Sequence, residues 1–177
     1  LLGTIGPDDL VHLLWVNTLP FGQLEYTQAP LSTAGDARSW SRPVAIASDI
    51  NSGSLHIDSS GMLRVVFSKS DSQGLDHELY LIESSDSGAT WSEPVSILSL
   101  TTPVQSRMGG SIAVDDKGRY HVAWGIRSYE YGVYSQLGYT RSLDQGLTWS
   151  DPRELAVSNT APGVDVLSVF AFDDDEI

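Results

Sequence analysis

Short hydrophobic segments separated by polar turn residues recur along the whole chain. In one stretch, segments rich in branched and aromatic residues fall near residues 111–114, 120–126, 135–141 and 154–157. Gly, Asp, Asn and Ser, which favour turns, stand between them, and no apolar stripe of helical period is sustained. The pattern predicts four antiparallel strands in this stretch and an all-β protein.

The strand pattern belongs to an internal repeat. The eleven residues 84–94 recur as residues 142–152 with seven identities, and a third copy at 33–43 keeps only the Trp-Ser-x-Pro end. A second marker at 58–67 recurs in step with the first, at residues 6–15 and 115–124. The tryptophans of the first marker are 51 and 58 residues apart, and the ends of the second marker are 52 and 57 residues apart. Two independent markers therefore define one repeat.

Four antiparallel strands in a repeat of this length are typical of a β-propeller blade. We therefore expect an all-β fold, a β-propeller of four-stranded antiparallel blades that is incomplete in this chain. The expected single partial propeller divides into blade 1 at about 1–50, blade 2 at about 51–107, blade 3 at about 108–163 and the first strand of blade 4 at about 164–177. Open sheet edges at both ends predict a covering partner, either the remaining blades of a longer chain, which we favour, or a second copy.

The repeated eight-residue motif resembles the Asp-box, or BNR repeat, of the sialidase superfamily, which implies a sialidase-like propeller. In such a turn the aspartate accepts backbone N–H bonds, the glycine takes positive φ, the threonine hydroxyl closes the turn and the tryptophan packs against the blade. The residues expected to have these structural roles are Asp86, Gly88, Thr90, Trp91, Asp144, Gly146, Thr148 and Trp149. The resemblance also implies that the active site lies on the opposite face of the propeller.

Charge and composition exclude several classes of binding partner and chemistry. The chain has 10 Lys and Arg against 23 Asp and Glu, a formal net charge of -13, which disfavours nucleic acid and anionic membranes. No cysteine is present, so disulfides and cysteine nucleophiles are excluded, and no segment approaches the roughly 20 apolar residues of a membrane span. The acidic run at 173–176 lacks the spacing of an EF-hand loop and is expected to be a solvated turn. No metal and no cofactor are expected.

Functional residues are expected in the loops that join the second and third strands and successive blades, because the short turns share the other face. Sialidases, by resemblance, hold the substrate carboxylate with three arginines and use a tyrosine nucleophile, a glutamate and an acid/base aspartate. The candidates in these loops are Arg107, Arg127, Tyr129, Glu130 and Asp76, with Asp71 as an alternative acid. The arginine-rich motif that precedes the first blade in that family is absent, so the catalytic set is incomplete.

Two functions follow from this reading. The favoured one is a non-catalytic Asp-box propeller module that binds a glycan or a protein, or acts as a scaffold. The alternative is part of a sialidase-like exo-glycosidase, a glycoside hydrolase whose remaining catalytic residues lie outside the chain. The resemblance favours a secreted protein, extracellular or periplasmic.

Overall fold

The computed structural model describes residues 1–17, 22–70, 76–104, 106–128 and 134–157. Within these residues the secondary structure is almost entirely β, in three antiparallel four-stranded sheets whose strands follow chain order. Sheet 1 contains β1 (Leu2–Ile5), β2 (Leu10–Asn17), β3 (Gln23–Pro30) and β4 (Val44–Ala47). Sheet 2 contains β5 (Ile50–Ile57), β6 (Leu63–Ser70), β7 (Asp76–Ser84) and β8 (Val95–Val104). Sheet 3 contains β9 (Ser106–Val114), β10 (Tyr120–Ser128), β11 (Tyr134–Ser142) and β12 (Arg153–Val157).

The four strands predicted over residues 111–157 correspond to β9 to β12. The main difference is at β9, which begins at Ser106 rather than near residue 111. Where the third copy of the first marker lacks its aspartate and glycine, two short 3-10 helices, Leu31–Thr33 and Ala37–Ser39, join β3 to β4. The expected first strand of a fourth blade lies outside the described residues.

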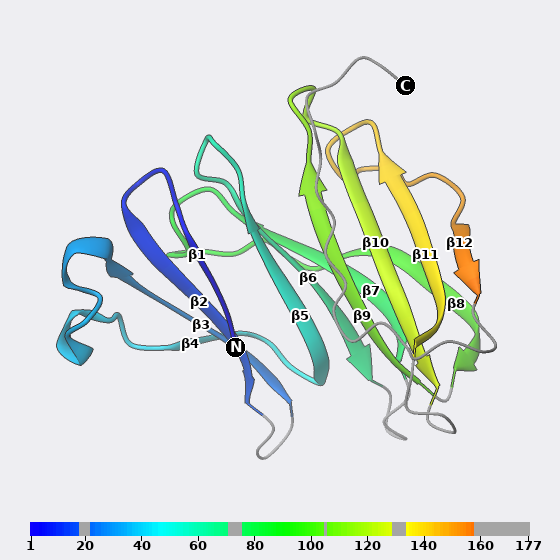
Figure 1. Cartoon of the computed structure of the whole chain (residues 1–177), viewed down its shortest axis with the longest axis horizontal. Helices are drawn as coiled ribbons and strands as arrows, with labels where there is room; N and C mark the ends of the chain where they lie inside the picture. Colours follow the sequence, from blue (N-terminus) through cyan, green and yellow to red (C-terminus); the bar gives the residue numbers. More distant parts are fainter. Residues whose placement is uncertain (18–21, 71–75, 105, 129–133, 158–177) are drawn as a thin grey trace.

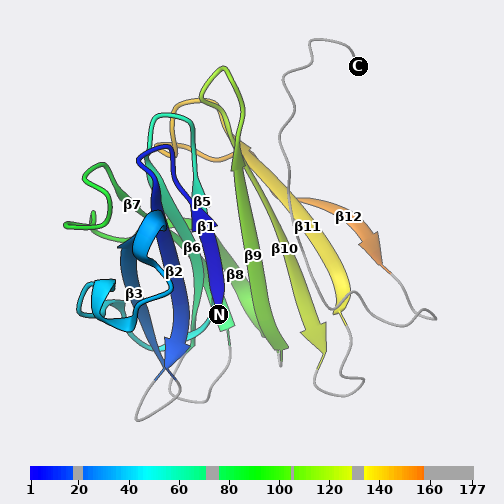
Figure 2. The ribbon, with the colours of Figure 1, turned by 60° about the vertical axis from the view of Figure 1, so that its left-hand side comes forward.

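The sheets stack face to face, with sheet 2 between sheets 1 and 3 (Figure 1). Their first two strands make the main contacts between sheets, β2 and β1 with β5, and β9 with β5 and β6. The turns that join first to second strands lie at one end of the stack, which we call the turn end (Figure 2). Strands β2, β6 and β10 finish at the opposite end, which we call the loop end. No helix in the described part of the chain is long and apolar enough to cross a membrane.

Two apolar clusters hold the stack together because β6 is buried on both faces. Side chains alternate along a strand, so Val65 and Phe67 pack toward sheet 1 while Val66 packs toward sheet 3. The cluster between sheets 1 and 2 joins Val65 and Phe67 to Leu14 and Leu24, and all four are at most 1% exposed. Burial of this apolar area supplies the main stabilisation between sheets.

Candidate functional site

The two candidate arginines lie directly opposite each other at the loop end of sheet 3. Arg107 in β9 and Arg127 in β10 are register partners, although 20 positions separate them in the sequence. Cα atoms of such partners are about 4.5 to 5.5 Å apart. The register of β10 with β11 shifts between Ile126 and Arg127, and irregularities of this kind often accompany functional sites in sheets. The sequence placed both arginines in loops, and this was wrong because β9 and β10 extend further than the turn signals indicated.

The other candidates are not joined to this pair by strand pairing. Asp76 is also a strand residue, the first of β7 in sheet 2, where it is the register partner of Ser70 and Val104. Tyr129 and Glu130 lie outside the described residues, as does Asp71. The described structure therefore brings together the two arginines alone among the predicted functional residues.

A tyrosine–glutamate pair that the sequence analysis missed lies on β7. The Tyr80 hydroxyl donates to Glu78 Oε2, and the Ser99 hydroxyl donates to Glu78 Oε1 at 3.2 Å. The hydrogen bond to Glu78, with partial burial, raises the pKa of Tyr80 to about 12. The phenol is therefore protonated at neutral pH. Because residues two apart on a strand share a face, the Glu-Leu-Tyr spacing was the signal that could have identified the pair.

Repeated aspartate turns occupy the turn end. The Asp86 carboxylate accepts hydrogen bonds from Thr90 N at 2.8 Å and Thr90 Oγ1 at 2.6 Å, and Asp144 accepts the same bonds from Thr148 at 2.8 and 2.5 Å. These bonds, the threonine hydroxyl first, lower the pKa of both aspartates to about 2. Among the described residues, no group of three or more His, Asp or Glu side chains is placed to hold a metal ion. The two carboxylates are engaged within their own turns.

The glycines and tryptophans of these turns link them to the core. Gly88 and Gly146 have φ of 84° and 86°, the left-handed region that favours glycine. Trp91 packs against the cluster between sheets 1 and 2 and meets Tyr26 edge-on, with ring centroids 5.2 Å apart. Trp149 packs against the cluster between sheets 2 and 3.

Histidine–tyrosine pairs recur in sheets 1 and 3 near the turn end. His12 Nδ1 lies 2.6 Å from the Tyr26 hydroxyl, and His121 Nδ1 lies 2.7 Å from the Tyr139 hydroxyl. The interplanar angle is 27° in both pairs. The second ring nitrogen contacts a carboxylate in each case, from Asp8 at 3.4 Å and from Asp115 at 3.2 Å.

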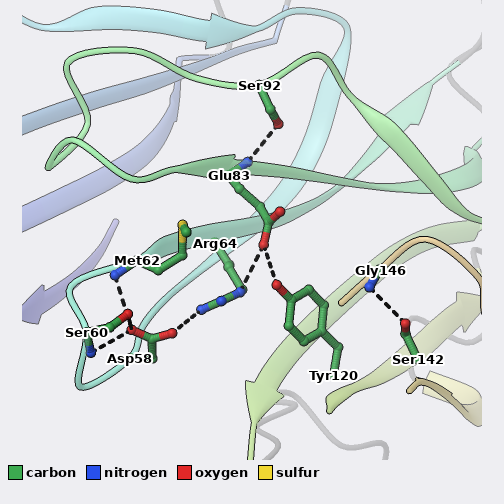
Figure 3. A network of polar contacts seen from close by, with 9 residues as sticks. All are labelled: Asp58, Ser60, Met62, Arg64, Glu83, Ser92, Tyr120, Ser142 and Gly146. Atoms are coloured by element: carbon green, nitrogen blue, oxygen red, sulfur yellow. Dashed lines mark hydrogen bonds and ion pairs between the residues drawn. The ribbon is translucent and has the colours of Figure 1, made fainter. Parts of the chain in front are cut away.

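Sheet 2 has Arg64 at the equivalent position, and its guanidinium joins sheet 2 to sheet 3 (Figure 3). Arg64 Nη1 donates to Asp58 Oδ2 at 2.7 Å, and Arg64 Nε donates to Glu83 Oε1 at 3.0 Å. The Tyr120 hydroxyl donates to the same Glu83 oxygen at 2.7 Å, and the guanidinium carbon lies 4.7 Å from the Tyr120 ring centroid. Burial alone would raise the pKa of Asp58, but the bonds from Ser60 and Arg64 lower it to about 2. The Asp58 carboxyl is therefore ionised at neutral pH.

A cavity of about 540 Å³ lies between sheets 2 and 3 at the turn end. The turns β5–β6 and β9–β10 form two of its sides, and the aspartate turn of sheet 3 contributes Gln145. Its lining is mostly polar and includes Asp58, Ser60, Arg64, Asp116, Tyr120 and Gln145. The cavity lies at the end of the sheets where the sequence predicted structural turns alone.

Comparisons with known proteins matched structures but not sequences. No family model and no curated protein matches the chain. A protein of unknown function from Dyadobacter fermentans has a TM-score of 0.60 at 16% identity, over 86% of this chain and 49% of that one. An ulvan lyase, a polysaccharide lyase bound to -[GlcA(1-4)Rha3S]-, has a TM-score of 0.58 at 13% identity, over 95% and 42%. A mutant of the NanB sialidase of Streptococcus pneumoniae has a TM-score of 0.53 at 16% identity, over 87% and 28%.

These similarities show the fold. The chain is an all-β, sialidase-like β-propeller structure built from antiparallel four-stranded sheets, so the predicted fold class is confirmed. The chain spans less than half the length of each of these three structures.

Proposed function

We propose that this chain is a carbohydrate-binding propeller module in which Arg107 and Arg127 hold an anionic group of a glycan. The observation that carries the proposal is their direct pairing across β9 and β10 at the loop end. Two guanidinium groups present several N–H donors in fixed planar geometry, which suits a carboxylate or a sulfate. They also supply local positive charge in a chain whose formal net charge is -13.

Two of the structurally similar proteins act on carbohydrates, which supports a carbohydrate ligand for this chain. One is a sialidase and another is a polysaccharide lyase bound to -[GlcA(1-4)Rha3S]-. The repeated aspartate turns, which resemble Asp-boxes, support the same sialidase-like family of propellers. Secretion, to the outside of the cell or the periplasm, is part of this proposal because polymeric glycans are encountered there.

A second candidate function is part of a sialidase-like glycoside hydrolase. The observation that favours it is the Tyr80–Glu78 hydrogen bond, since a tyrosine nucleophile beside a glutamate is one known solution for glycoside cleavage. The raised pKa of Tyr80 weakens this candidate, because Glu78 would have to remove the phenolic proton during attack. We therefore favour binding without turnover.

A further blade would cover the open face of sheet 1. Val11, Leu13 and Trp15 are half-buried, while the equivalent residues of sheet 2, Leu63, Val65 and Phe67, are fully buried against sheet 1. The repeat thus uses these positions for packing between blades. The proposed occupant is a blade of the same polypeptide. Light scattering that finds dimers of the isolated chain would favour a second copy instead.

The test measures glycan binding and turnover by the full chain. Isothermal titration calorimetry with glucuronic acid and with a sialic acid should detect binding, and Arg107→Ala or Arg127→Ala should weaken it at least about tenfold. Arg42→Ala, which removes an exposed arginine far along the chain from the pair, is the control and should leave the affinity unchanged. If both arginine variants bind with the same affinity as the unsubstituted chain, the proposal is overturned. Release of the aglycone from a fluorogenic sialoside would favour the hydrolase.

A further inference from the structure

The junction between sheets 1 and 2 is closed by hydrogen bonds at the turn end. The Ser87 hydroxyl donates to Asp8 Oδ2 at 2.8 Å, and the Tyr26 hydroxyl donates to the Ser87 carbonyl at 3.0 Å. The Tyr26 ring also fills the space beside Gly88, where an added Cβ would lie 2.2 Å from the ring. These contacts pull the aspartate turn of sheet 2 onto sheet 1.

The junction between sheets 2 and 3 has different residues at the three equivalent positions. Ser60 replaces Asp8, Leu81 replaces Tyr26, and Gln145 replaces Ser87. Leu81 has no hydroxyl, and the Ser60 hydroxyl donates within its own turn, to Asp58 Oδ1 at 2.5 Å. Ser60 and Gln145 instead both line the cavity, so the opening coincides with different residues at three equivalent positions, two in sheet 2 and one in sheet 3.

Beside the cavity, the network of Arg64, Glu83 and Tyr120 connects sheet 2 to sheet 3. Arg64 stacks on Tyr120 and both groups contact Glu83, so these polar contacts join sheet 2 to sheet 3 in addition to the apolar cluster between them. The Arg64 side chain is only 7% exposed and already bonds two carboxylates. It therefore acts as a wall of the cavity rather than as a site for an anion.

The remaining lining suits hydroxyl groups on one side and carbon–hydrogen surface on the other. The Asp116 carboxylate and the Gln145 amide stand at exposed positions on two turns, with the Ser59 hydroxyl on a third. Ile57 and Val114 provide apolar surface beside them. The volume of about 540 Å³ lies within the range of about 300 to 1,000 Å³ that is typical of sites for small organic ligands, and the mostly polar lining favours a polar ligand.

The charge of the lining selects against acids. Three carboxylates, Asp58, Asp115 and Asp116, line the cavity; Arg64 pairs with Asp58 and Arg119 with Asp115, so Asp116 gives the lining its excess negative charge. Burial alone would raise the pKa of Asp115, but hydrogen bonds from Arg119 and His121 lower it to about 2, so this group is ionised at neutral pH. An anionic sugar would meet repulsion here that a neutral one would not.

We propose that this cavity is a second carbohydrate site, which binds a neutral sugar residue. It lies at the turn end, whereas the arginine pair lies at the loop end, and the two sites are proposed to prefer ligands of different charge, neutral here and anionic there. The proposal does not depend on the function proposed for the arginines. A chain with both sites would hold a neutral and an anionic part of a glycan at opposite ends of the stack.

The test is a titration of the ¹⁵N-labelled full chain with methyl glucoside, methyl galactoside and glucuronic acid, followed by NMR. At least one neutral glycoside should shift the amide signals of Gly118 and Gln145, and glucuronic acid should shift them at least about fivefold less at equal concentration. Asp116→Ala and Gln145→Ala, both at exposed turn positions, should each raise the Kd at least about fivefold. Asp151→Ala, an exposed aspartate outside the cavity, is the matched control and should leave the Kd unchanged.

A variant designed to close the cavity tests the same proposal by removing the site. Ser60→Asp with Gln145→Ser rebuilds part of the closed junction and should abolish the shifts without the buried Leu81 being touched. Shifts that disappear in the Arg107→Ala, Arg127→Ala double variant would place the ligand at the loop end and overturn the proposal. An absence of shifts with both neutral glycosides, or equal shifts with glucuronic acid, would overturn it as well.

Discussion

The Tyr26 hydroxyl donates a 3.0 Å hydrogen bond to the carbonyl of Ser87, 61 residues further along the chain. The bond joins β3 of sheet 1 to the aspartate turn of sheet 2. His12, which is fully buried, contacts the same hydroxyl through Nδ1 at 2.6 Å. Burial, with the nearby charges of Asp8 and Asp86, raises the pKa of Tyr26, so the hydroxyl keeps its proton.

Tyr26→Phe should therefore lower the free energy of unfolding by about 1 to 2 kcal/mol, because it leaves the buried His12 ring and the Ser87 carbonyl without this partner. Urea denaturation at pH 7 measures the change. Tyr139→Phe is the matched control, since its hydroxyl bonds His121 within sheet 3 and that ring is 22% exposed. The control should cost less, and an equal cost would show that the bond between sheets adds nothing.

Gly88→Ala should destabilise the fold by about 2 to 4 kcal/mol. The residue has φ of 84°, and an added Cβ would lie 2.2 Å from the Tyr26 ring, so backbone strain and a steric clash add together. Gly35→Ala is the control, because nothing lies within 4 Å of its added Cβ. Thermal unfolding should show a clear loss of Tm for Gly88→Ala and little change for Gly35→Ala.

The aspartate turns make the free energy of unfolding depend on pH in the acidic range. The pKa of Asp86 is about 2 in the folded chain against an ordinary value of 3.8, so its contribution is present above about pH 4 and is lost as the pH falls toward 2. Thr90→Val removes the hydroxyl bond that lowers this pKa most, and should raise the pKa of the Asp86 carboxyl in an NMR titration. Ala89→Ser, at the exposed neighbouring position, should leave the pKa of Asp86 unchanged. An unchanged Asp86 titration in Thr90→Val would contradict the assignment.

Arg64→Met should cost about 2 to 4 kcal/mol, because it leaves Asp58 and Glu83 without the buried guanidinium that bonds both. Arg119→Met removes a guanidinium that is 38% exposed and bonds Asp115, and should cost about 0 to 1 kcal/mol. Urea denaturation compares the two. A larger loss in Arg119→Met would show that the connection between sheets 2 and 3 is not made by Arg64.

Local features were predictable because local physics decides them. The bonds from Thr90 to Asp86 and the positive φ of Gly88 follow from residues within one turn. The extent of β9 was not predictable in the same way, since Ser106 to Gly110 pair with β10 through contacts that the turn residues do not encode. Arg107 was therefore assigned to a loop, and its pairing with Arg127 was missed.

The sequence by itself determined the repeat, the alternating strands and the aspartate turns, because a period of two and a turn motif act over a few neighbouring residues. Only the tertiary structure decided what the repeats do where they meet. The Tyr26 hydroxyl bonds Ser87 across one junction, whereas Leu81 at the equivalent position packs beside Gly146 and has no hydroxyl to donate. The reason is that each junction is built from side chains about 60 residues apart. The presence or absence of a single hydroxyl group therefore changes a contact between two sheets without changing the strands themselves.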